Sequence, residues 1–157
     1  MIKTTKTKKP SMLWLPNNKK MFRTILVIVS FLLKFNDELV AQGKNTAYGV
    51  NAGISISSGD HNAAFGYQAL ANTTHGSENV ATGSQTLLVN TTGRQNVANG
   101  SQVLYYNTTG NWNTANGAYA LYKNITGENN AANGHSALGS NTTGYYNTAN
   151  GLSLIHI

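Results

Sequence analysis

Apolar, small and polar residues recur in this chain with a period of seventeen, from Gly66 to Gly151, without insertion or deletion. Counted from the first glycine of each unit, the pattern is G-x-x-A-L-x-x-N-T-T-G-x-x-N-x-A-N. Each unit has one fixed leucine, and these are Leu70, Leu87, Leu104, Leu121 and Leu138. A fixed period predicts a repeat architecture, in which each copy packs on the copies before and after it.

The composition of the unit predicts an all-β fold. Two glycines and two or three asparagines per copy disfavour a helix, and seventeen residues are too few for a helical pair. We expect two short extended segments, x-x-A-L-x-x and N-x-A-x, separated by glycine turns with positive φ. Identical segments of successive coils then pair about 4.8 Å apart. The predicted fold is a parallel β-solenoid or β-roll of 17-residue coils.

The regular copies occupy residues 66–151, and a degenerate copy precedes them at residues 42–65. There Asn45-Thr46-Ala47-Tyr48-Gly49 matches the junction between units, and Gly59 lies seventeen residues before Gly76. Residues 54–58 depart from the consensus. We expect this copy to be an N-terminal cap, because the first coil covers an otherwise open end.

Two rows of asparagine follow the repeat. One row is Asn79, Asn96, Asn113, Asn130 and Asn147, and the other is Asn72, Asn90, Asn107, Asn124 and Asn141. Stacked amides can form a hydrogen-bonded ladder along the solenoid, or each asparagine can support its own turn. Both interpretations are favoured over a ligand-binding role. The N-x-T triplets also match the glycosylation sequon, but the turn requires the same residues.

One leucine and a few alanines per coil make a thin core. We therefore expect stability to come also from sideways association, with a homotrimer as the expected state. Aromatic residues at variable positions are the candidates for this contact: Tyr105, Tyr106, Trp112, Tyr119, Tyr122, Tyr145 and Tyr146.

The net charge of +6 lies entirely within residues 1–41. From Gln42 onward, the bases Lys44, Arg94 and Lys123 balance the acids Asp60, Glu78 and Glu128. A neutral repeat region has no source of long-range attraction to phosphate, which excludes a nucleic-acid partner.

The N-terminal third has the pattern of an export signal. Arg23 precedes the apolar run 25–33, which is too short to span a bilayer. We predict a signal peptide at residues 21–41, cleaved after Ala41, with Met21 as the alternative start and 1–20 as an upstream extension. An uncleaved anchor and a buried helix at 24–35 are the alternatives. The expected location is the cell surface or the extracellular space.

The last six residues, 152–157, do not continue the repeat. They match a translation of the transposon end sequence used in sequencing-library adapters, so we expect an artefact there and a natural gene that continues. The alternative is a terminal cap.

No catalytic, cofactor-binding or metal-binding residues are predicted. Between residues 42 and 151 the acids are Asp60, Glu78 and Glu128, and the histidines are His61, His75 and His135. Adjacent Asp60 and His61 would point to opposite faces of a strand, so we interpret them as a surface pair. Without cysteine, no thiol nucleophile or disulfide framework exists. Calcium-binding nonapeptides and a phosphate-binding loop are excluded by their missing residues.

The units 96–100, 113–117 and 147–151, alternating with Asn-Thr-Thr-Gly, resemble the repeats of bacterial tail-fibre-like surface proteins, which often end in an endosialidase-type chaperone domain. More distantly, they are similar to the head repeats of trimeric autotransporter adhesins. The resemblance covers residues 45–151 and implies a homotrimeric β-solenoid at the cell surface. The adhesin units have Ile before the glycine, where this chain has Phe65, Thr82, Asn99, Asn116, Asn133 and Asn150.

The expected function is a non-enzymatic structural or adhesive fibre that acts by multivalent display. Its expected partners are further copies of the chain and an unidentified surface glycan or protein, with no small-molecule substrate. An ice- or crystal-binding solenoid is the alternative, suggested by Thr-Thr in nearly every coil. Each coil should present only one outward threonine, and thermal hysteresis would test this function. A polysaccharide-degrading spike would require acidic pairs.

Overall fold

The computed structural model describes residues 39–40 and 44–152. The chain divides into two units, Met1–Leu33 and Lys34–Ile157, and all described residues belong to the second. The predicted upstream extension, most of the predicted signal peptide and all of the adapter-like segment except Leu152 lie outside the described residues.

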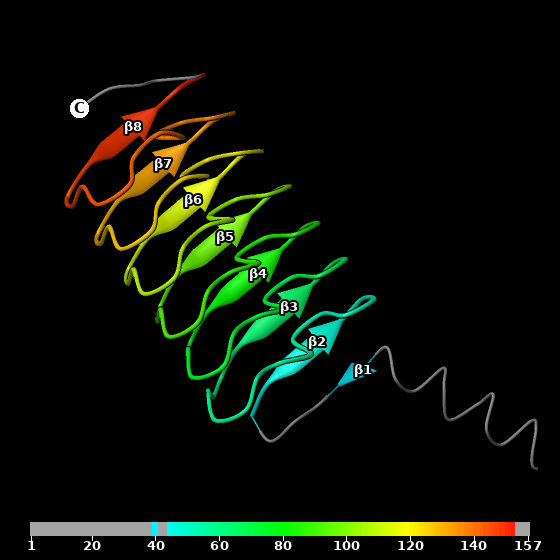
Figure 1. Cartoon of the computed structure of the whole chain (residues 1–157). Coiled ribbons are helices and arrows are strands. Elements are labelled where there is room, and N and C mark those ends of the chain that lie inside the picture. Colours follow the sequence, from blue (N-terminus) through cyan, green and yellow to red (C-terminus); the bar gives the residue numbers. More distant parts are fainter. Residues whose placement is uncertain (1–38, 41–43, 153–157) are drawn as a thin grey trace, which may run out of the picture. The chain divides into compact units, whose positions relative to one another are not determined.

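Eight short strands form one sheet in which spatial order follows chain order (Figure 1). The strands are β1 (Leu39–Val40), β2 (Thr46–Tyr48), β3 (Ala63–Phe65), β4 (Val80–Thr82), β5 (Val97–Asn99), β6 (Thr114–Asn116), β7 (Ala131–Asn133) and β8 (Thr148–Asn150). Strands β2 to β8 pair in parallel, each with its equivalent one coil later. The predicted all-β parallel solenoid is confirmed, and the described residues contain no helix.

Strand β1 is the exception to this arrangement. It pairs antiparallel with β2, so that Leu39 lies opposite Tyr48 and Val40 opposite Ala47. These two residues fall within the predicted signal peptide, and cleavage after Ala41 would remove β1. That cleavage stays a prediction.

Each strand of the stack buries its central alanine and points its two neighbours outward. Ala64, Ala81, Ala98, Ala115 and Ala132 are fully buried and lie in register from β3 to β7. The residue before each glycine, where the adhesin repeats have Ile, is therefore outside the core. The polar residues at this position therefore do not enter the core.

The first of the two predicted extended segments is not a strand. Leu70 and its equivalents have φ near +50°, and the residue two before each leucine also has positive φ. The resulting turns bring neighbours such as Ala69 and Leu70 into the core together, whereas an extended strand would point them to opposite faces. The left-handed backbone costs about 1–2 kcal/mol at a leucine, and burial of the side chain offsets it with about 1.5–3 kcal/mol.

The two sets of glycines serve different purposes. Those that follow the strands, such as Gly66 and Gly134, have φ near +130°, as the sequence predicts. The second set, which includes Gly93, lacks positive φ. A Cβ at Gly93 would lie 2.5 Å from the carbonyl oxygen of Gly110, so here glycine permits the close approach of successive coils.

The first coil lacks the core leucine of the other coils and has a buried isoleucine at another position instead. Gly53 occupies the leucine position, with a φ of 59°, and leaves the core volume of a leucine empty. Ile56, at the position of the second asparagine row, is buried and comes within 3.2 Å of a Cβ built at Gly53. The first coil thus fills its core from a different position.

The first asparagine row is a buried ladder. The backbone N–H and Nδ2 of Asn79 both donate to Oδ1 of Asn62, each at 3.0 Å. Nδ2 also donates to the carbonyl oxygen of Gly93 at 2.8 Å. The same three bonds are made by Asn62, Asn96, Asn113 and Asn130. The predicted ladder is confirmed.

The second row combines a ladder with support of the local turn. Nδ2 of Asn107 donates to Oδ1 of Asn90 at 2.8 Å and to the carbonyl oxygen of Gly110, in its own turn, at 3.0 Å. Asn124 and Asn141 repeat both bonds. Asn72 does not belong to the row, because it is exposed and the equivalent of Asn90 is Thr73. The Thr73 hydroxyl is buried without a hydrogen-bond partner.

We predict that Asn96→Ala destabilises the solenoid strongly. The change removes the acceptor for two donors of Asn113 and a donor to Gly110. Each buried group left without a partner costs about 1–3 kcal/mol, so we expect a loss of about 3 kcal/mol or more, measured by urea unfolding. Asn116→Ala, on the exposed side of β6, is the control and should cost less than about 0.5 kcal/mol. Equal losses for the two variants would contradict the ladder.

We predict that Thr73→Asn stabilises the chain. The new amide would extend the second ladder by one rung, accept a bond from Asn90 and remove an unpartnered hydroxyl. The expected gain is about 1 kcal/mol in urea unfolding. Asn107→Thr, the reverse change within the ladder, should destabilise. A neutral or destabilising Thr73→Asn would show that the row is not continued at this coil.

Candidate functional site

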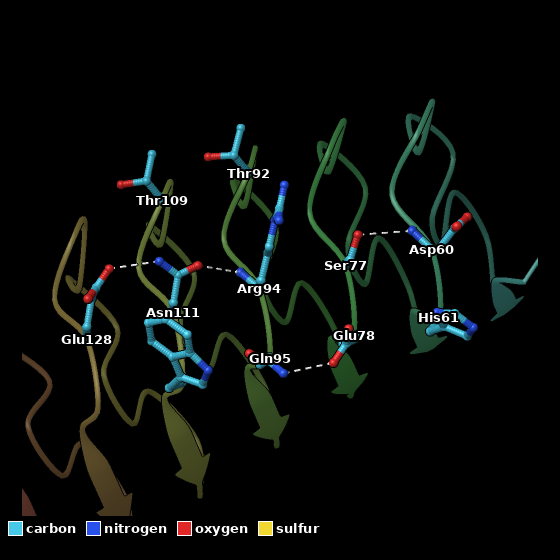
Figure 2. Close-up of a pocket in the computed structure, with 11 residues that line it drawn as sticks. Asp60, His61, Ser77, Glu78, Thr92, Arg94, Gln95, Thr109, Asn111 and Glu128 are labelled. Atoms are coloured by element: carbon cyan, nitrogen blue, oxygen red, sulfur yellow. Dashed lines mark hydrogen bonds between the residues drawn. The ribbon is translucent and has the colours of Figure 1, made fainter.

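The described residues form a groove of about 810 Å³ that crosses successive coils (Figure 2). Its lining follows the repeat, because residues seventeen apart lie in line. One line is Asp60, Ser77, Arg94, Asn111 and Glu128, and the next is His61, Glu78, Gln95 and Trp112. Thr92 and Thr109 also line the groove. At about 4.8 Å per coil, the first line is about 19 Å long.

Backbone hydrogen bonds join residues of the second line to residues of the first line on the preceding coil. The N–H of Glu78 donates to the carbonyl oxygen of Asp60 at 2.9 Å, and the N–H of Trp112 donates to that of Arg94 at 3.1 Å. The second line has φ between 55° and 60°, so each turn projects two consecutive side chains to the same side. Side chains that differ between coils are thereby presented at regular spacing.

Hydrogen bonds between coils orient several of these side chains (Figure 2). Gln95 Nε2 donates to Glu78 Oε2 at 2.9 Å, and Asn111 Nδ2 donates to Glu128 Oε1 at 2.8 Å. The backbone N–H of Arg94 donates to Asn111 Oδ1 at 2.8 Å. Each amide and carboxylate retains further hydrogen-bonding capacity toward a ligand.

Trp112 gives the groove its one large apolar surface. Trp112 is 53% exposed, and it lies next to polar residues on neighbouring coils. An exposed indole beside oriented polar groups has the composition of a binding surface, because one side chain supplies both contact area and a donor.

All three carboxylates among the described residues line the groove, against one guanidinium, that of Arg94. The net charge of the lining is therefore −2 with His61 neutral. Lys44 Nζ lies 3.8 Å from Asp60 Oδ2, in an ion pair exposed to solvent. The groove thus disfavours anionic ligands.

The structure corrects the sequence interpretation of Asp60 and His61. They lie in a turn, with φ of 59° at His61, and both line the groove rather than opposite faces. Asp60 and Glu78 also come from adjacent coils. Both carboxylates are exposed. The arrangement can donate and accept hydrogen bonds to a ligand.

The other two histidines of the described residues, His75 and His135, do not line the groove. Nδ1 of His75 is 2.9 Å from the hydroxyl of Thr74, and Nδ1 of His135 is 3.0 Å from that of Ser136. No group of three or more His, Asp or Glu residues that could bind a metal occurs within residues 39–40 and 44–152.

The aromatic residues predicted to make lateral contacts fall into two groups. Tyr105, Tyr106, Tyr119 and Tyr122 pack together with centroid distances of 4.7–5.6 Å, and we call this group the tyrosine cluster. Burial, and then a hydrogen bond with Tyr106, raises the pKa of Tyr122. Trp112, Tyr145 and Tyr146 instead belong to the two positions that form the first two lines of the groove.

The threonine pairs differ in exposure from coil to coil. Thr74, Thr91 and Thr108 occupy equivalent positions, and the hydroxyl of each donates to a backbone carbonyl of the next coil. Thr92 and Thr109, the second threonines of their pairs, are exposed, whereas Thr91 and Thr108 are half-buried. These two coils fit the prediction of one outward threonine per coil, but in the last coil Thr142 and Thr143 are both exposed.

Comparison with known proteins adds no relationship: no family model matches the sequence, and no curated protein and no solved structure is similar to it. In the part of the chain that the structure describes, no helix is long and apolar enough to cross a membrane.

Proposed function

We propose that this chain is a non-enzymatic structural and adhesive rod, exported and displayed at the cell surface. The observation that carries the proposal is the separation of roles within each coil. The buried positions repeat the same alanine, leucine, asparagine and glycine, whereas the outward positions differ from coil to coil. Such a scaffold supports a series of contact groups at fixed spacing.

Two further observations support a role in binding. The groove brings all the carboxylates of the described residues, the arginine and Trp112 onto one surface. The ladders of buried asparagine link every coil from Asn45 to Asn147, so contact groups on distant coils belong to one rigid body. A rigid array favours multivalent attachment, because later contacts form without further ordering of the chain.

We further propose a homotrimer assembled through the tyrosine cluster. Tyr106 and Tyr119 are exposed, and tyrosine is enriched at the centres of protein interfaces. Three parallel copies would place three equivalent grooves on one fibre. Affinity for a repetitive surface would then exceed that of a single groove.

The surface location is tested with a fluorescent antibody against the rod and intact cells that produce the chain. We expect labelling that is lost when the cells are treated with protease, together with weaker attachment of cells that lack the gene. Antigen found only after lysis would contradict the proposal.

The oligomeric state is tested by size-exclusion chromatography with light scattering. We expect a mass of three mature chains, and the double variant Tyr106→Ser/Tyr119→Ser should shift the equilibrium to the monomer. Tyr146→Ser, an exposed tyrosine outside the cluster, is the matched control and should leave the trimer intact. A wild-type monomer at all concentrations, or a trimer unaffected by the double variant, would contradict assembly through the cluster.

A further inference from the structure

The spacing of the groove indicates the kind of ligand that it accepts. Its polar side chains recur about every 4.8 Å along the first two lines. This interval is close to the advance of one hexopyranose ring in an extended β-(1→4)-linked glycan. A straight chain of such rings can stay in step with the coils, and since successive rings of this linkage face opposite ways, every second ring would present the same edge to the groove.

The chemistry of the lining agrees with a sugar. Gln95 and Asn111 offer amides, and Glu78 and Glu128 offer carboxylates, at positions fixed by hydrogen bonds of 2.8–2.9 Å. Sugar hydroxyls both donate and accept, so they can pair with amides and carboxylates alike. The C–H groups of a ring with equatorial hydroxyls form an apolar face, which can pack on the exposed indole of Trp112.

The same features disfavour other polymers. The lining charge of −2 repels uronic acids, sialic acids and nucleic acids. An extended peptide along the groove would find few unpaired backbone groups, because the coil backbones bond to one another along the stack. A neutral glycan meets neither obstacle.

We propose that the groove binds a linear, neutral, β-(1→4)-linked hexose polysaccharide, with Trp112 packing against a ring and Gln95 and Asn111 bonding to its hydroxyls. This proposal rests on the adhesive function proposed above and specifies its ligand. The groove spans about four rings at the coil spacing, since the first line crosses five coils.

Cellohexaose is the probe, because it is neutral, extended and soluble. The chain has two tryptophans, so Trp112 is the only indole of the predicted mature chain, and the variant Trp14→Phe makes it the only indole of the full chain. We expect saturable changes in its fluorescence on titration with cellohexaose. Maltohexaose, the curved α-linked isomer, and hexagalacturonate, an acidic chain of the same length, should cause none.

Calorimetry on variants then locates the site. Trp112→Ala should weaken cellohexaose binding at least about tenfold, and Gln95→Ala about fivefold. Tyr67→Ala is the matched control, since Tyr67 is 50% exposed and lies outside the groove lining, and its affinity should stay within about twofold. Circular dichroism and urea midpoints verify that each variant is folded.

Three results would overturn the proposal: no cellohexaose binding by the folded protein, unchanged binding by Trp112→Ala, or preference for hexagalacturonate. The probe is soluble and monovalent, so binding depends on neither surface location nor trimer formation. Surface display without cellohexaose binding would reject the glycan and leave the adhesive rod standing. Cellohexaose binding without surface display would reject the surface-displayed rod and leave the glycan site standing.

Discussion

The structure depends on one hydrogen-bonding constraint, the buried ladder of asparagine side chains. A buried amide must have partners for its oxygen and for both N–H groups, and no single coil supplies them. Asn96 finds them only with Asn79, Gly110 and Asn113, which belong to three other segments of the stack. Any slip of one coil against the next would leave these groups unpaired. The ladder therefore fixes the register that a thin core of alanine and leucine specifies weakly.

This constraint also explains where variation is tolerated. The ladder asparagines, the strand alanines, the leucines and the second set of glycines share the interior, and changes there meet another coil directly. The outward positions of the turns carry no such requirement. Trp112, Gln95, Glu78 and His61 occupy equivalent positions in four coils and share a backbone conformation, although their chemistry differs. A uniform interior thus supports a surface that can acquire a binding groove without loss of the fold.

Much of the fold could be predicted from the sequence. The uninterrupted period, the asparagine rows and the glycine content predict parallel stacked coils, the strand of N-x-A-x and the ladder. The Ala-Leu segment is predicted to be extended, but its leucines have positive φ. A signal to the contrary existed, since Ala69 and Leu70 are adjacent apolar positions, and a half-buried strand alternates. In the first coil, Ile56 fills the core volume that the leucine fills in the other coils, because Gly53 stands at the leucine position. This replacement could be recognised only from the three-dimensional packing.

The groove could be predicted only in part. Writing the chain in lines of seventeen aligns Asp60 with Arg94 and Glu128, and Glu78 with Trp112, so the grouping of charges was accessible. The concavity was not, because it arises from left-handed turns that the residue types do not specify. Asp60 and His61 illustrate this limit, since strand geometry would separate side chains that the turn brings to one side.

Native-state hydrogen exchange of the asparagine backbone amides tests the central claim most directly. The amides of Asn79, Asn96, Asn113 and Asn130 donate to side-chain oxygens on the preceding coil, not to a backbone carbonyl. The stacked ladder predicts that these four amides exchange as slowly as the strand amides of Val80, Val97 and Thr114. Exchange of the four amides at the rate of exposed turns, while the strands stay protected, would contradict it.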